Sequence, residues 1–179
     1  MAFFERFCEV LLLGASGGEA AAPGIFLERF YIVLLLTHLI AAGVLAGAMI
    51  HNLLIVFKYL QGKFGRKKRE LYFARVGLWS YVIVYLFGCL IYPAFRVYFR
   101  AVYFDVDLSW ATGLFEVKEH WGSLGLALFF VYYYLRKSFE PDVEKDKLWF
   151  YVPVCVLLNI IVWYKIIVGC YLSLLKGSF

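Results

Sequence analysis

Four ionisable side chains, Glu116, Lys118, Glu119 and His120, lie within five positions, directly before an apolar run. Glu116 and His120 are four residues apart, so on a helix they share a face, whereas Glu119 points elsewhere. An imidazole beside a carboxylate can bind a metal ion or relay a proton, because the carboxylate fixes the orientation of the ring. This segment is therefore the first candidate for chemistry.

Further polar side chains interrupt the other apolar stretches of the chain. His38 lies within LLLTHLIAA, Lys165 lies between IIVWY and IIVGC, and Tyr92 and Arg96 close the stretch 72–95. An ionisable group inside a bilayer costs a few kcal/mol, and it persists where it is paired or lines a functional cavity. We therefore expect these groups to meet those of the Glu116 segment.

The composition predicts an integral membrane protein. Of the 179 residues, 64% are hydrophobic and 21% are aromatic, and the mean hydropathy is +0.77. Soluble domains are closer to half apolar. The length allows four spans of about 20 residues each and leaves no room for a large soluble domain. The net charge of +5 sets orientation in such a protein and gives no argument for nucleic-acid binding.

Four apolar stretches predict an all-α fold, an integral membrane four-helix bundle over residues 25–179. Each stretch can satisfy its own backbone as a helix, which the hydrocarbon core requires, and short connections make sequential helices antiparallel neighbours. Residues 1–24 predict a short amphipathic helix lying in the interface, followed by a linker. The expected spans are 30–57, 72–95, 115–135 and 149–172.

The distribution of Lys and Arg predicts the orientation. The first hairpin holds seven of them, the second holds four, and the opposite side holds six. Positive charge favours the cytoplasmic side, so the loops 58–71 and 136–148 are expected in the cytoplasm and both termini on the other side, in a bacterial inner membrane. The basic loop would lie against anionic headgroups, and bound lipids are expected.

The third predicted span is short, so its polar first residues are expected to lie within the membrane. Residues 121–135 cover only about 22 Å of a hydrocarbon core about 30 Å thick. The helix should therefore draw Glu116 to His120 inward. Along the helix axes, His38, His120 and Lys165 lie about 28, 22 and 24 Å from the cytoplasmic ends of their spans. All three are thus expected in the outer leaflet.

Two imidazoles at similar depth on different helices suggest a b-type haem. His38 and His120 would be the axial ligands, and Glu116 or Glu119 would orient an imidazole. Arg96 and Arg100, four residues apart, would meet the propionates. His51 is the third and last histidine, finds no partner, and is expected to contact other helices or headgroups. The four cysteines show no haem-attachment or zinc spacing.

The chain resembles the four-helix membrane families that include the CopD-like proteins and the HemJ-type protoporphyrinogen oxidases. The likeness lies in the four-span layout, the span-one histidine of LLLTHLIAAG and the Lys-bearing start of span three, FEVKEHW. The resemblance implies haem or porphyrin handling. It matches His38 to the span-one histidine and Lys118 to the span-three lysine.

Two other functions stay open beside haem-linked electron transfer or porphyrin handling. The chain could be a cofactor-free accessory subunit of a larger membrane complex, with other membrane-protein subunits as partners. It could also be a proton or ion path built on Glu116, Glu119, His120 and Lys165, although polar residues are few in mid-membrane. The sequence shows no Gly-rich phosphate loop and no nucleophile–base spacing, which disfavours nucleotide binding and hydrolase chemistry.

Overall fold

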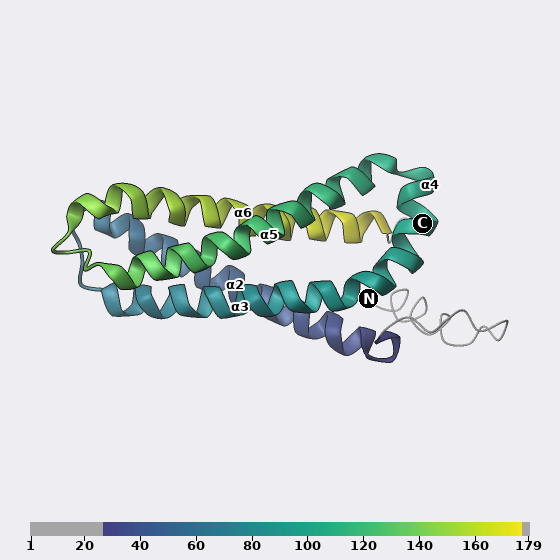
Figure 1. Cartoon of the computed structure of the whole chain (residues 1–179), viewed down its shortest axis with the longest axis horizontal. Helices are drawn as coiled ribbons and strands as arrows, with labels where there is room; N and C mark the ends of the chain where they lie inside the picture. Colours follow the sequence, from purple (N-terminus) through teal and green to yellow (C-terminus); the bar gives the residue numbers. More distant parts are fainter. Residues whose placement is uncertain (1–26, 177–179) are drawn as a thin grey trace.

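The computed structural model describes residues 27–176, and this part of the chain is helical (Figure 1). Its elements are η1 (Glu28–Phe30), α2 (Tyr31–Leu60), α3 (Lys67–Phe95), η2 (Arg96–Phe104), α4 (Asp105–Asp107), α5 (Ser109–Ser138), η3 (Lys145–Lys147) and α6 (Leu148–Lys176). The all-α prediction is confirmed for these residues. The interfacial helix expected in residues 1–24 lies outside the described residues.

The four long helices pack as antiparallel neighbours in the order α2, α3, α5, α6, with α6 returning to α2. Helices α2 and α5 are therefore diagonal. One end of the bundle, here called the basic end, carries the connections 61–66 and 139–147. The other, the arch end, carries the connection 96–108 (Figure 1). The topology follows from the short connections, as the sequence predicts.

Three helical segments are long and apolar enough to cross a membrane: Tyr31–Leu60, Lys67–Asp107 and Lys145–Leu175. These cover three of the four predicted spans. The fourth predicted span, 115–135, lies inside α5, which is equally long but carries charged residues at positions 116, 118, 119, 136 and 137. Its length, about 45 Å at 1.5 Å per residue, also matches a span.

The helix α5 differs from its sequence expectation in where it begins. It starts at Ser109, so more than a turn of helix precedes Glu116, yet any 20 residues of α5 that cross about 30 Å of hydrocarbon still include charged side chains. The depth of its charged residues therefore depends on where the neighbouring helices hold it. Its buried side, Ala111, Phe115, Gly122, Gly125 and Phe129, does not include His120.

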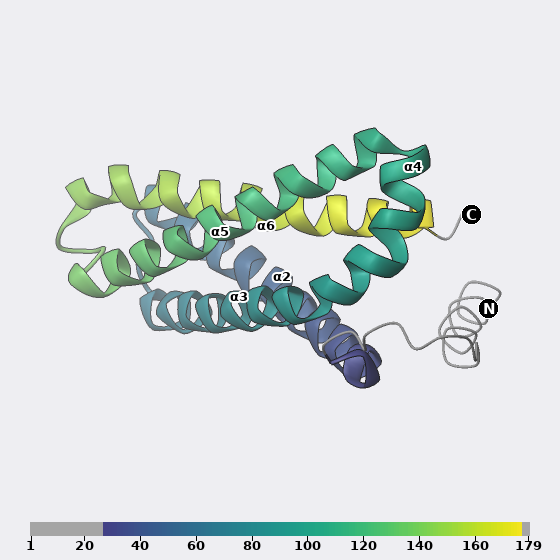
Figure 2. The same cartoon turned by 45° about the vertical axis from the view of Figure 1, so that its right-hand side comes forward.

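The hydrophobic core lies mainly toward the basic end. A large cluster there includes Met49, Val56, Tyr81, Phe129 and Leu158. A smaller one at the arch end contains Phe104, Ala111, Phe115, Val168 and Leu172. In α2 no residue before Leu45 is fully buried. The beginnings of α2 and α5 lie on opposite sides of the bundle in both views (Figures 1 and 2), so the arch half is the looser half.

Pro93 marks the point where α3 changes its winding. Proline lacks an N–H and clashes with the carbonyl four residues earlier, so it kinks or ends a helix. Here α3 ends two residues later at Phe95 and the chain continues as nine residues of π-helix, Arg96–Phe104. The wider π turn accommodates the lost hydrogen bond without breaking the helix. It carries the chain into the arch that leads to α5.

Candidate functional site

The arch half of the bundle holds a polar site built from three helices. It is here called the His38 site and consists of His38 of α2, Lys118 and Glu119 of α5, and Lys165 of α6. Lys118, Lys165 and Glu119 all lie close enough to act electrostatically on the imidazole of His38.

Two members of the site lie against glycine residues of neighbouring helices. The ring of His38 lies against Gly88 of α3, where an added Cβ would be 3.5 Å from Cε1. The ammonium of Lys165 lies over Gly122 of α5, where an added Cβ would collide with Nζ. The same ammonium lies 5.5 Å from the centre of the Tyr81 ring, a distance at which the face of an aromatic ring stabilises a cation.

The charges of the His38 site do not balance. Lys118 pairs with Glu119 at 2.9 Å. Glu119 is also the carboxylate that acts electrostatically on the ammonium of Lys165, so one acid serves two lysines. The Nδ1 atom of His38 is buried and has no hydrogen-bond partner within the described residues. Buried polar groups are normally paired. The site therefore has an unused donor or acceptor beside an excess of positive charge.

His120 lies outside this site. Its side chain is exposed, and Nδ1 lies 2.8 Å from the carbonyl oxygen of Glu116. Because a carbonyl only accepts, Nδ1 is the donor in that hydrogen bond. Adjacent residues on a helix point about 100° apart, so the approach of Glu119 to His38 turns His120 away.

The remaining predicted residues of this half form a separate cluster around Arg100. Its guanidinium contacts Glu116 at 2.7 Å, Asp105 at 3.4 Å and the Tyr92 hydroxyl at 3.3 Å. Thr112 donates to Asp105 at 2.7 Å. The cluster joins η2 and α4 to the start of α5 and fixes the arch. Arg96 is exposed and lies near Asp105.

These positions decide how a haem fits the predicted ligand set. The pair His38–His120 is not assembled, so a haem held by both imidazoles does not fit this arrangement. His38 alone has a buried ring nitrogen without a hydrogen-bond partner in the described residues, and two ammonium groups act electrostatically on its ring. Among residues 27–176, no three His, Cys, Asp or Glu side chains are grouped so as to hold a metal ion.

A second polar cluster, which sequence reasoning missed, lies at the basic end. Glu70 of α3 is fully buried and is surrounded by donors from the other three long helices. Its carboxylate accepts hydrogen bonds from Asn52, Tyr59, Arg136 and Tyr151, and the Tyr132 hydroxyl lies 3.4 Å from it. We call this set, with Glu70, the Glu70 network. The charge-assisted bonds compensate the burial of the carboxylate.

The Glu70 network is itself cross-linked. Tyr132 donates to Asn52 Oδ1 at 2.5 Å, and the Cys155 thiol lies 3.3 Å from the same oxygen. Arg136 also donates to the Phe139 carbonyl at 3.3 Å and the Lys67 carbonyl at 3.2 Å. It thus ties the second connection to the start of α3. The network locks the basic end together.

One sequence signal points to Glu70. It is the single acid among the seven cations between Lys58 and Arg75, in a segment expected as a solvated loop. The helix α3 already begins at Lys67, which places Glu70 on its inner face. Asn52, the residue after His51, donates to the Glu70 carbonyl at 3.1 Å.

His51 itself lies apart from both clusters. Its Nδ1 donates to the Gly47 carbonyl at 2.8 Å, and its ring stacks on Phe73 of α3 at 5.1 Å. The structure thus divides the predicted residues between the His38 site, the Arg100 cluster and the α2–α3 surface. Comparison of the chain with family models, with curated proteins and with solved structures finds no match.

Proposed function

We propose that this chain is an integral membrane protein that binds a porphyrin or haem at the His38 site, with His38, Lys118 and Lys165 as its contacts. The proposal includes four membrane spans, the basic end in the cytoplasm, and an inner-membrane location in a bacterium. The observation that supports it is that Lys118 and Lys165, from two other helices, act electrostatically on His38, whose Nδ1 atom is buried without a hydrogen-bond partner in the described residues.

The membrane part of the proposal is supported by three helices of sufficient length and hydropathy. Exposed large apolar side chains cover them, for example Ile40, Trp79 and Trp149, which are 68%, 59% and 87% exposed. Large exposed apolar surfaces mark contact with lipid or with other proteins. The excess of Lys and Arg in the connections 61–66 and 139–147 supports the orientation.

The ligand class is supported by charge and by resemblance. Two ammonium groups against one carboxylate favour a ligand that brings its own carboxylates, such as the propionates of a tetrapyrrole. His38 and Lys118 are also the two positions that match the histidine and lysine of the HemJ-type layout. The bound tetrapyrrole would supply redox chemistry, whereas the chain would hold the propionates and place an imidazole nearby.

The proposal is tested by titrating the purified full-length protein, in a neutral detergent, with haemin and with protoporphyrin IX. Absorption of the Soret band and porphyrin fluorescence report binding. We expect His38→Ala and the double substitution Lys118→Gln with Lys165→Gln to lose most of the affinity. The matched control, His120→Ala, removes an imidazole from the exposed face of α5 and should bind as the parent does.

Loss of binding in His120→Ala but not in His38→Ala would overturn the assignment of the site. A parent protein that binds neither compound would overturn the ligand class. Reduction with dithionite then separates the two forms of the proposal, because a bound haem with a strong axial imidazole gives a sharp visible band on reduction, whereas a porphyrin without iron does not.

One observation favours a second candidate, the role of an accessory subunit in a membrane complex. Gly43 and Gly47 form a GxxxG on α2, yet a Cβ added at either would meet nothing within 4 Å. Small residues of this spacing let membrane helices approach closely, and here no helix of the described chain uses them. If this role holds, Gly43→Leu with Gly47→Leu should abolish co-purification of partner subunits and leave porphyrin binding unchanged.

A further inference from the structure

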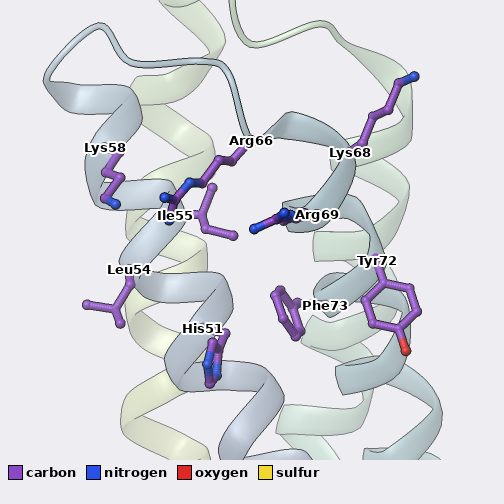
Figure 3. A pocket seen from close by; sticks show the side chains of 9 residues that line it. All are labelled: His51, Leu54, Ile55, Lys58, Arg66, Lys68, Arg69, Tyr72 and Phe73. Atoms are coloured by element: carbon purple, nitrogen blue, oxygen red, sulfur yellow. The ribbon is translucent and has the colours of Figure 1, made fainter.

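The space between α2 and α3 at the basic end is a pocket of about 550 Å³ (Figure 3). Its upper part is cationic, with Lys58 from the end of α2, Arg66 from the connection, and Lys68 and Arg69 from the start of α3. In Figure 3, Arg66 and Arg69 reach from the α3 side toward the space between the helices, whereas Lys68 leans away. The pocket therefore gathers positive charge at one depth.

None of these four cations takes part in an ion pair within residues 27–176. Their neighbour Lys67, in contrast, is paired with Glu140 at 3.0 Å and with Asp142 at 2.9 Å. The one acid of the segment, Glu70, is turned into the bundle and bound by Arg136. Like charges this close repel one another, so an anion in the pocket would relieve an unfavourable arrangement.

The lower part of the pocket is apolar and aromatic. Ile55 is buried, and the ring of Phe73 is stacked on His51 at 5.1 Å. The flanks are formed by Leu54 and Tyr72, which are 55% and 61% exposed. A soluble anion such as phosphate gains no favourable contact with this apolar wall. An acyl chain binds such a wall favourably, because it gains dispersion contacts and buries apolar surface there.

We propose that this pocket binds an anionic phospholipid, with phosphate oxygens on Lys58, Arg66 and Arg69 and the start of an acyl chain on Leu54 and Phe73. Several uncompensated cations favour a head group with two phosphates over one with a single phosphate. The inference rests on the membrane insertion proposed above, but not on the tetrapyrrole, which would lie in the other half of the bundle.

The test uses the full-length protein in a neutral detergent, titrated with cardiolipin and with phosphatidylglycerol of the same acyl chains, with bound lipids counted by native mass spectrometry. The pocket variant combines Lys58→Gln, Arg66→Gln and Arg69→Gln. Each cation near an anionic surface contributes a factor of about five to the affinity, so the combined variant should bind cardiolipin more than tenfold more weakly. Cardiolipin should exceed phosphatidylglycerol in the parent protein.

The matched control combines Lys63→Gln, Arg75→Gln and Lys137→Gln, which removes the same charge outside the pocket. It should retain the affinity of the parent. An equal loss in both variants would show general surface attraction and overturn the site. Inorganic pyrophosphate that competes at the same concentration as cardiolipin would show that the apolar wall contributes nothing and would overturn the lipid. Unchanged helical circular dichroism establishes that the variants are folded.

Discussion

The ammonium of Lys165 on α6 lies directly over Gly122 on α5, where even one methyl group would collide with it. The basic side chain thus depends on the absence of a side chain on the neighbouring helix. Lys165 has few alternatives, because the residues around it in sequence are apolar. This relationship gives the first prediction about the His38 site.

Gly122→Ala should displace Lys165 and weaken porphyrin binding without removing any polar group. It should also lower the thermal stability, because the long lysine must leave its place beside Tyr81. Gly113→Ala is the matched control, since a Cβ at that position of α5 meets nothing within 4 Å. There, alanine should stabilise the helix by about 0.5–1 kcal/mol. Thermal unfolding in detergent and porphyrin titration measure both effects.

The Glu70 network predicts a strong coupling between Glu70 and Arg136. Substituting either residue by Gln leaves the other charge buried and unpaired, which should cost about 3–5 kcal/mol of unfolding free energy. The double substitution removes both charges and should be less destabilised than the sum of the singles. Denaturant unfolding of the four proteins in detergent gives the double-mutant cycle.

Glu140→Gln supplies the contrast for that cycle. Its carboxylate pairs with Lys67 at the surface, where its side chain is 60% exposed. Exposed ion pairs contribute about 0–1 kcal/mol, so this variant should unfold almost as the parent does. Strictly additive effects of the two buried substitutions would contradict the direct pairing of Glu70 with Arg136.

The connection between α5 and α6 should respond to acid. Hydrogen bonding from Lys67 holds the pKa of Asp142 below its ordinary value of 3.8, and hydrogen bonding from Lys147 lowers the pKa of Glu144. A lowered folded-state pKa gives a stabilising contribution that is present above the unfolded pKa and is lost as the pH falls through the folded pKa. Amide protection in residues 139–147 should therefore persist down to about pH 4 and fall below it.

Asp142→Asn is the control for the acid response. It removes the titrating carboxylate, so protection in the same connection should be lower at neutral pH and change less with acid. Hydrogen exchange followed by mass spectrometry provides the measurement. A connection whose protection in the parent protein is constant through this range would contradict the role of the Lys67 pair.

The proposed orientation predicts opposite accessibility of the two ends. Lys63→Cys lies in the first connection and Val106→Cys lies in the arch, and both positions are exposed. A membrane-impermeant maleimide added to intact cells whose outer membrane has been permeabilised should label position 106 and not position 63. After lysis both should react. Labelling of position 63 before lysis would reverse the topology, and the parent chain gives the background from native cysteines.

The sequence predicts much of this architecture because apolar length and short connections determine it. The four helices and their antiparallel order follow from span positions. The pairing of His38 with His120 depends on rotation about the axis of α5, which span length does not determine. A difference of one residue turns a side chain by about 100°, so Glu119 acts electrostatically on His38 whereas His120 is exposed.

The Glu70 network shows a different limit. A charged residue between cations in a short connection is normally solvated, and counting charge along the chain treats it so. The buried state of Glu70 depends on donors contributed from far along the sequence by Tyr132, Arg136 and Tyr151. Only the packing of all four helices brings these donors together, and no local sequence pattern predicts the burial of Glu70.

The uneven distribution of buried residues has a mechanical consequence. One end is clamped by the Glu70 network and the large core, while the opening turns of α2 bury no residue completely. Moving the opening turns of α2 away from the other helices would therefore sacrifice little packing and leave the clamped end intact. Such a movement would open a lateral path from the surrounding lipid for the proposed tetrapyrrole. No part of the chain would have to unfold.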